Sequence, residues 1–120
     1  MTNSLQPGLE LRREWVVSEA HLYNPTDLPG REVLSSPSMI MEMETACAEL
    51  ARRHRAGSLT TVGFHVDVKH VAPAKVGARM VTVARLEAVD GRKLTFSVDA
   101  RDGERLVGVG KHRRAVVEVK

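Results

Sequence analysis

The chain has 120 residues, of which 42% are hydrophobic and 28% charged, and its formal net charge is +3 at pH 7. This balance is typical of one globular domain that buries about two thirds of the surface of its unfolded chain, and it excludes a disordered protein. With one Trp, one Tyr and two Phe, the chain lacks platforms for stacking on nucleic-acid bases. We therefore expect a single domain over residues 1–120, with residues 1–9 flexible and no nucleic-acid partner.

The basic residues are spread along the chain, with two small clusters at residues 52–55 and 111–114. These clusters are too weak to indicate nucleic-acid binding, although one of them suits a phosphate group. The single cysteine, Cys47, excludes an intramolecular disulfide and a cysteine-based metal site. The first ten residues lack the pattern of a secretion signal, and no apolar run approaches the ~20 residues of a membrane span. We therefore expect a cytoplasmic protein without membrane contacts.

The first half of the chain predicts a strand, an irregular segment and one long helix. The strand is expected over residues 11–18, and turn-forming residues follow over residues 21–31. Ser36 is the predicted N-cap of the helix and Pro37 its first residue, and about five turns follow before Gly57. Glu44 lies at the border of an apolar arc, which consists of Met39, Ile40, Met43, Ala46, Cys47 and Leu50.

From residue 59 onward the hydrophobic period changes to two, which predicts strands near 59–71, 78–88, 93–101 and 105–118. Asp-Gly pairs at residues 90–91 and 102–103 are typical of tight hairpins, and residues 72–77 are expected to form the remaining turn. The element order predicts an α+β fold in which one antiparallel sheet wraps one helix. Because strand 78–88 is apolar on both faces and Met41 lies outside the apolar arc, we expect a homodimer that buries the excess apolar surface.

Three side chains are candidates for chemistry. If no bulge intervenes, alternation along strand 59–71 places His70 on the inward face, together with Val62, Phe64, Val66 and Val68. His70 is either a hydrogen-bonded core or interface histidine, or part of a Ser, Glu and His site. Glu44 either reaches solvent or is paired. Ser36 either caps the helix or offers a hydroxyl at a helix N-terminus, where N–H groups can bind an oxyanion or a thioester carbonyl.

The other histidines do not define a site. His65 is expected to be solvated and His54 lies at an exposed basic helix end, while His21 and His112 have no partner that the sequence identifies. No histidine spacing is typical of a metal site, and we expect no metal. The chain also lacks a nucleophile elbow, a Walker loop and a dinucleotide fingerprint.

Three segments together resemble a known family. Val33–Ile40, followed by Met43-Glu44 and Ala46, resembles the "V-L-(A/S)-T-P-x-M-I…M-E-x-A" opening of the fluoroacetyl-CoA thioesterase-like group of hotdog-fold proteins. Residues 61–72 are similar to that group's "T-V-G-x-x-V-x-V-x-H-x-A" strand, and residues 110–117 to its last strand. The likeness spans about residues 10–118. It implies a hotdog fold that dimerises through its sheets, as a dimer or a dimer of dimers, with active sites near the interface.

The resemblance also implies a Thr, Glu and His constellation, which Ser36, Glu44 and His70 carry in this chain. Serine in place of threonine keeps the hydroxyl but has a less restricted rotamer. By this likeness His70 polarises the reacting centre or relays a proton to it. Glu44 either activates a water molecule or attacks the acyl carbon itself, and the sequence does not separate these two routes.

The implied substrate is a short-chain acyl-CoA thioester, hydrolysed without a metal or redox cofactor. Segment 19–35 is expected to form part of a lid over the acyl pocket, and with Tyr23 as its only aromatic residue it does not assign fluoroacetyl-CoA. A non-catalytic acyl-CoA or small-ligand binding protein and an enoyl-thioester hydratase or dehydratase remain alternatives. The predicted substrate contacts are Gly63, Met39, Met43 and Phe64, with Lys69, Lys111, Arg113 and Arg114 for the phosphates.

Overall fold

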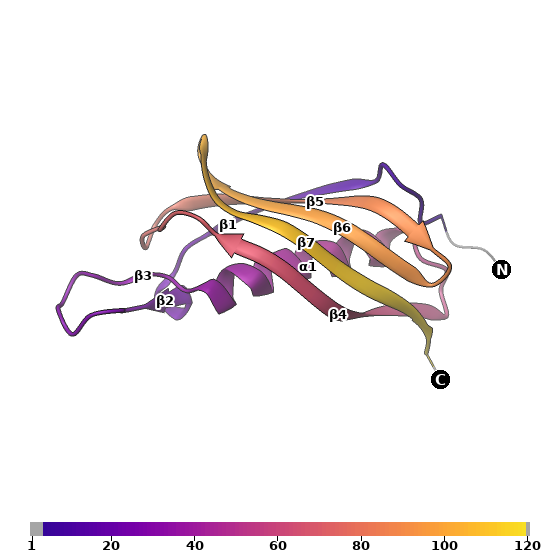
Figure 1. Ribbon diagram of the computed structural model, residues 1–120, viewed down its shortest axis with the longest axis horizontal. Helices are drawn as coiled ribbons and strands as arrows, with labels where there is room; N and C mark the ends of the chain where they lie inside the picture. The colour runs from indigo at the N-terminus through magenta and orange to yellow at the C-terminus, as the bar shows by residue number, and fades with distance from the viewer. Residues whose placement is uncertain (1–3, 120) are drawn as a thin grey trace.

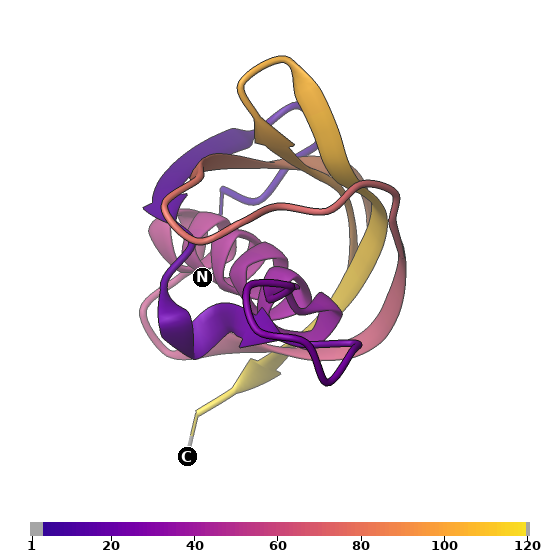
Figure 2. The same ribbon diagram turned by 90° about the vertical axis from the view of Figure 1, so that its left-hand side faces the viewer.

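The structure, a computed structural model, describes residues 4–119 and consists of one long helix and a curved antiparallel sheet (Figure 1). The strand order in the five-stranded sheet is β1-β5-β6-β7-β4. Viewed from the end, the sheet curves around the helix (Figure 2), which confirms the predicted α+β hotdog fold. The main elements are β1 (Glu10–Val16), α1 (Ser36–His54), β4 (Leu59–His70), β5 (Arg79–Asp90), β6 (Lys93–Asp102) and β7 (Arg105–Glu118).

Helix α1 begins one residue earlier than predicted. Ser35 is the N-cap, with an extended backbone and a hydroxyl that accepts a hydrogen bond from the Ser38 N–H at 3.2 Å. Ser36 is already helical, so the prediction that Ser36 caps the helix is wrong, and its hydroxyl is not needed for capping. No helix within residues 4–119 has the length and apolarity that a membrane crossing requires.

The core lies between α1 and the inner face of the sheet. The apolar arc of α1 is buried as predicted, except that Ile40 is only half-buried. Met41 points away from the core and is 60% exposed, also as predicted. The largest fully buried apolar side chains on the five-stranded sheet are Phe96, Met80, Leu86, Leu94, Val98 and Val107.

The two predicted hairpins are present, but the turn predicted at residues 72–77 is not a hairpin. Gly91 and Gly103 have φ values of 59° and 62°, a left-handed conformation that favours glycine in two-residue loops. Strand β4 pairs with β7 at one edge of the sheet, whereas β5 pairs with β1 and β6. Residues 71–78 therefore cross the end of the sheet, and this connection is too long for a tight turn.

A β-bulge in β4 changes which side chains face the helix. The register with β7 shifts between Gly63 and His65, so Phe64 has no partner in the pairing. Before the bulge Gly63 faces α1, and after it Val68 and His70 do. The predicted inward orientation is therefore wrong for Val62 and Phe64, which are 49% and 48% exposed, and right for His70.

The N-terminal segment and the segment before α1 are more ordered than predicted. Residues 4–9, expected to be flexible, make contacts: the Ser4 N–H donates to the His54 carbonyl at 2.9 Å, and Leu5 is buried. Residues 1–3 lie outside the described residues. The 3-10 turn Glu19–His21 leads into a two-stranded sheet of β2 (Leu22–Tyr23) and β3 (Val33–Leu34). Such short strands have no hydrophobic period, so the sequence did not predict them.

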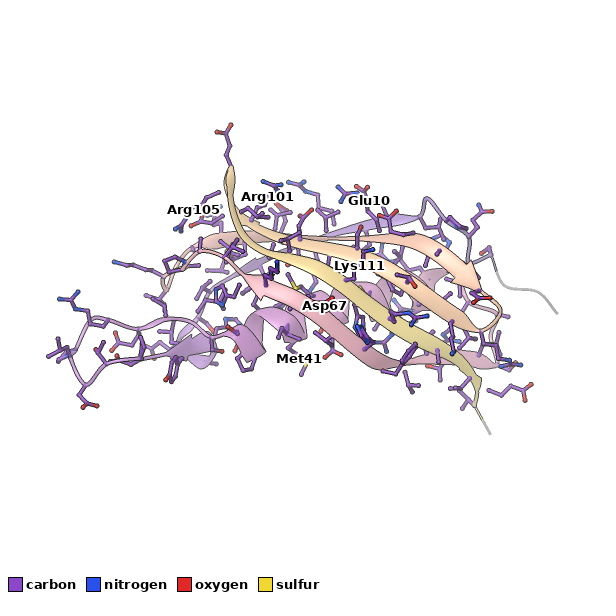
Figure 3. All side chains as sticks on the ribbon, viewed as in Figure 1. Glu10, Met41, Asp67, Arg101, Arg105 and Lys111 are labelled. Carbon is purple, nitrogen blue, oxygen red and sulfur yellow. The ribbon has the colours of Figure 1, made fainter. Side chains whose placement is uncertain are left out.

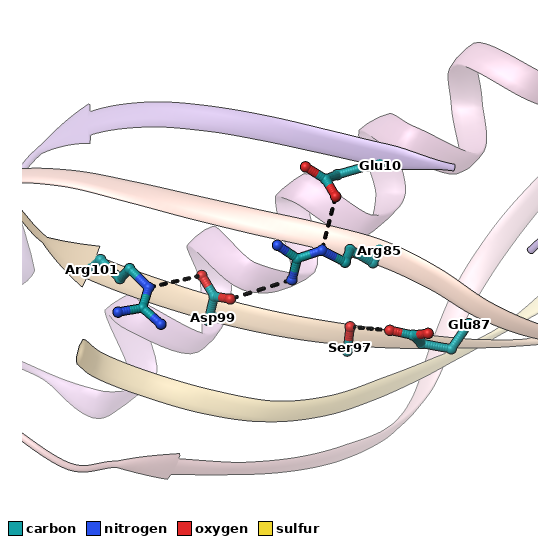
Figure 4. Close-up of polar contacts among 6 residues, drawn as sticks. All are labelled: Glu10, Arg85, Glu87, Ser97, Asp99 and Arg101. Atoms are coloured by element: carbon teal, nitrogen blue, oxygen red, sulfur yellow. Dashed lines mark hydrogen bonds and ion pairs between the residues drawn. The ribbon is translucent and has the colours of Figure 1, made fainter. Parts of the chain in front are cut away.

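The outer face of β1, β5 and β6 is polar (Figure 4). Arg85 on β5 lies between Glu10 at 2.8 Å and Asp99 at 3.4 Å. Val83 shares this face, between its cross-strand neighbours Arg12 and Asp99, and is only 7% exposed. The prediction that β5 offers a second apolar surface is therefore wrong.

Candidate active site

Ser36 and His70 form a hydrogen-bonded pair where the start of α1 meets the end of β4. The Ser36 Oγ and the His70 Nδ1 are 2.8 Å apart. The His70 Nε2 is buried and has no hydrogen-bond partner among residues 4–119. His70 also lines a cavity of about 290 Å³, together with Val33 and residues 71–73. An unpartnered buried nitrogen beside a cavity is typical of a group that meets a ligand.

Glu44 belongs to a second group of polar side chains, in the middle of α1. Its side chain is 33% exposed, and its Oε1 lies 3.8 Å from the Nε2 of the buried His112. Arg114 Nη1 lies 3.1 Å from the same Nε2, and Arg114 is held in place because its Nε donates to the Thr61 Oγ1 at 2.9 Å. The carboxylate therefore faces a neutral imidazole and a fixed guanidinium across the inner face of the sheet.

The hydrogen bonds of His112 define its protonation. A carbonyl oxygen can only accept, so Nδ1 carries the proton and donates to the His65 carbonyl at 2.9 Å. A guanidinium can only donate, so Nε2 is the acceptor from Arg114. Burial is the largest effect and lowers the pKa of His112, and the charge of Arg114 acts in the same direction, while the hydrogen bond to the His65 carbonyl and the Glu44 carboxylate oppose them. His112 is therefore neutral at pH 7.

Gly63 lies where these side chains meet. A Cβ atom at this position would lie 2.9 Å from the His112 Cε1, 3.1 Å from the Glu44 Oε1 and 3.2 Å from the Arg114 Nη1. The absence of a side chain leaves the carboxylate room beside the β4 backbone. A cavity of about 400 Å³ opens here between α1 and β4, lined by Met41, Glu44, Thr45, Ala48, Thr61, Val62, Gly63 and Arg114.

The two groups do not meet within one chain. Ser36 and Glu44 are eight residues apart on one helix, which corresponds to about 12 Å along its axis. The structure thus brings Ser36 to His70, as expected for the predicted constellation, but places Glu44 with His112 and Arg114.

The predicted substrate contacts are divided between both faces of the sheet. Phe64 lies under the Arg113 guanidinium, 5.2 Å from the ring centroid, on the outer face. Cross-strand pairing places Lys111 opposite Asp67, also on that face (Figure 3). Lys69 alternates with Val68 and points the same way as Asp67. Of the four predicted basic residues, only Arg114 lines the cavity beside Glu44, while Met39 and Met43 are buried in the core.

The sequence analysis missed His112. The only indication in the sequence was strand alternation. On β7, His112 alternates with Lys111 and Arg113 and therefore shares the inner face with Gly110 and Arg114. Cys47 is near this site but is not a nucleophile, because burial raises the pKa of its thiol to about 12 and keeps it protonated at neutral pH.

The buried neutral His112 predicts a loss of stability in acid. Its pKa is lower in the folded than in the unfolded chain, so between the two pKa values the unfolded chain binds more protons. The free energy of unfolding should therefore fall as the pH decreases below about 6.5, the ordinary histidine pKa. Urea unfolding between pH 8 and pH 5 should show a weaker pH dependence for His112→Asn than for the wild type. Parallel pH profiles of the two proteins would contradict this assignment.

Solved structures with this arrangement of helix and sheet are hotdog-fold thioesterases, and this chain is of that class. Over residues 17–120 its sequence matches the family described as fluoroacetyl-CoA-specific thioesterase (FlK). The chain belongs to this family. A fluoroacetyl-CoA thioesterase from Streptantibioticus cattleyicolor is 29% identical to it over 126 aligned positions, which cover 100% of this chain and 91% of the relative.

Two solved structures show how far the similarity extends. A threonine-to-serine variant of the fluoroacetyl-CoA thioesterase, solved in complex with acetyl-CoA, has a TM-score of 0.86 at 27% identity and covers 96% of this chain and 91% of its own. A thioesterase superfamily member from Thermus thermophilus has a TM-score of 0.85 at 26% identity and covers 94% of this chain and 84% of its own. The similarity therefore extends over nearly the whole chain.

Proposed function

We propose that this protein hydrolyses short-chain acyl-CoA thioesters to a carboxylic acid and coenzyme A. The observation that carries the proposal is the Ser36–His70 hydrogen bond, with a His70 Nε2 that is buried and has no hydrogen-bond partner among residues 4–119. Membership of the thioesterase family supports it. The related enzyme with serine in place of threonine was solved with acetyl-CoA, which supports a short acyl chain and a role for Ser36.

In the proposed reaction a water oxygen adds to the thioester carbonyl carbon, the C–S bond breaks, and the sulfur leaves as the CoA thiol. Glu44 either takes a proton from the attacking water or attacks the carbonyl carbon first, after which water hydrolyses the resulting anhydride. When the Ser36 hydroxyl donates to Nδ1, neutral His70 carries its proton on Nε2, where it can donate to the carbonyl oxygen or the leaving sulfur. No metal or redox cofactor takes part in either route.

The active form in this proposal is a homodimer that pairs through β4. This strand has a free edge over residues 59–70 and exposes Val62, Phe64 and Val66 by 42–49%. Antiparallel pairing of two β4 strands about a two-fold axis reverses the second helix, which brings its middle toward the first helix's N-terminus. Glu44 of one copy then approaches Ser36 and His70 of the other. Light scattering should give the mass of two chains.

The test of the function is release of free thiol from acyl-CoA esters, from acetyl to long chain. Hydrolysis that is fastest for short acyl chains is the expected result. Binding of acyl-CoA without turnover would replace the proposal by a binding protein, and hydration of an enoyl-CoA would replace it by a hydratase. A CoA ester substrate also fits a cytoplasmic protein, in which the free thiol of Cys47 stays reduced.

Gly63→Ala should lower kcat by about tenfold to a hundredfold, because the new Cβ displaces the Glu44 carboxylate. The melting temperature should fall as well, because the atom closest to the new Cβ is the Cε1 of the buried His112, so kcat is compared at a temperature where both proteins are folded. Gly57→Ala is the matched control, because a Cβ there meets nothing within 4 Å. An unchanged kcat for Gly63→Ala would show that the position of Glu44 does not matter for turnover.

A further inference from the structure

A basic cavity adjoins the Glu44 cavity at the C-terminal end of α1. It has a volume of about 150 Å³, and its lining includes the side chains of Arg52, Arg55 and Arg114, with Thr60 and Thr61 beside them. Ala48, Thr61 and Arg114 line both cavities. One groove between α1 and β4 thus runs from the Glu44 carboxylate, past the Arg114 guanidinium that borders both cavities, to Arg52 and Arg55. We call the basic end the arginine pocket.

Helix geometry explains this alignment. Glu44, Ala48 and Arg52 follow the spacing i, i+4 and i+8, which places them on one stripe of α1, and Arg55 is the extended C-cap residue directly after the helix. Arg52 lies about 12 Å further along the helix axis than Glu44. Arg53 does not line the pocket, although it neighbours Arg52 in sequence and both side chains are 60% exposed.

The arginine pocket has an excess of positive charge. Two carboxylates lie near it: Glu49 forms ion pairs with both Arg52 and Arg53 and neutralises at most one of them, and the charge of Glu44 acts on Arg114. Arg55 donates from Nη1 to the carbonyls of Ala56 at 3.3 Å and Gly57 at 3.0 Å, which position the guanidinium without removing its charge. Within residues 4–119 Arg55 and Arg114 form no ion pair with a carboxylate.

We propose that the arginine pocket binds a phosphate group of the CoA nucleotide while the thioester lies near Glu44. Guanidinium groups bind phosphate oxygens through paired, charge-assisted hydrogen bonds. The pocket replaces Lys69, Lys111 and Arg113 as the phosphate contact, because those three lie on the other face of the sheet. The inference rests on the proposed function and adds a selectivity: full CoA esters are preferred over thioesters that lack the nucleotide.

Two measurements test the pocket. Isothermal titration at low salt with adenosine 3′,5′-bisphosphate, the nucleotide end of CoA, should detect binding to the wild type and a loss of about tenfold in affinity in Arg55→Gln and Arg52→Gln. In turnover assays the same variants should raise KM for the best acyl-CoA ester by about tenfold at unchanged kcat. They should leave kcat/KM for the matching N-acetylcysteamine thioester unchanged, because that ester has no phosphate.

Arg53→Gln is the matched control and should change neither the nucleotide affinity nor KM, although it removes the same charge from the same helix end. The proposal that the arginine pocket binds phosphate is contradicted if the wild type does not bind the bisphosphate. It is also contradicted if Arg53→Gln weakens binding as much as Arg55→Gln. Failure of the proposed function looks different. In that case no ester is hydrolysed, yet the bisphosphate still binds and Arg55→Gln still weakens its binding. The phosphate site is then supported even though the proposed reaction is not.

Discussion

Replacing Glu44 by glutamine is expected to lower kcat for acyl-CoA hydrolysis by ~100-fold or more. Glutamine keeps the size and the hydrogen-bonding oxygen of the side chain, but it cannot accept the proton of a water molecule or attack a carbonyl carbon. The loss should be the same by either route, because both need the carboxylate. Thiol release under saturating substrate measures it directly.

Glu42 is a matched control for this experiment. It lies two residues from Glu44 on the same helix, but its Oε1 accepts from the Arg13 Nε at 3.0 Å, away from the groove. Glu42→Gln should therefore retain wild-type kcat. The substitution removes a partly exposed ion pair, which should change the stability of the protein only slightly. If Glu44→Gln hydrolyses acyl-CoA as fast as Glu42→Gln, Glu44 is not part of the catalytic machinery.

Phe96→Ala is expected to have the largest effect on stability, a loss of about 3–5 kcal/mol in the free energy of unfolding. Phe96 is fully buried on β6, and its ring stacks on His112 with centroids 6.4 Å apart. Truncation leaves a cavity under α1 and removes the packing that holds His112 beside Glu44. The melting temperature should fall by about 10–20 °C for a domain of this size.

Phe96→Leu serves as the control, because leucine fills most of the volume and should recover more than half of the lost stability. Calorimetry at fixed protein concentration measures both variants, since pairing of two chains would make the melting temperature depend on concentration. A Phe96→Ala protein as stable as the wild type would contradict the packing of β6 against α1.

Local patterns were sufficient to predict most of the elements. The helix, the four long strands and both Asp-Gly hairpins are present within a few residues of their predicted bounds, because each depends on a repeat or turn signal of neighbouring residues. The same patterns placed Glu44 at the border of the apolar arc and His70 on the inward face. The role of Ser36, Glu44 and His70 together came from the family resemblance, and it stays a prediction until activity is measured.

The sequence did not predict features that depend on contacts between distant residues. The bulge at Phe64 reverses the alternation of β4, and no local signal separates it from a regular strand. The pairing of β4 with β7 instead of β5 depends on the whole sheet. For the same reason the predicted phosphate contacts Lys111 and Arg113 were assigned without knowledge of which face they occupy, whereas alternation along the strand had already placed Lys69 on the outer face.

By itself the sequence determined the α+β class, the faces of α1 and the family, because periodicity and motif spacing are properties of neighbouring residues. The tertiary structure decided which polar groups meet. Ser35 caps the helix in the folded chain, so the Ser36 hydroxyl can form a hydrogen bond with His70. The fold also buries His112 beside Glu44. It also placed Arg52 and Arg55 beside Arg114 of β7. Such meetings depend on how the sheet curves around the helix, and only the folded chain fixes that curvature.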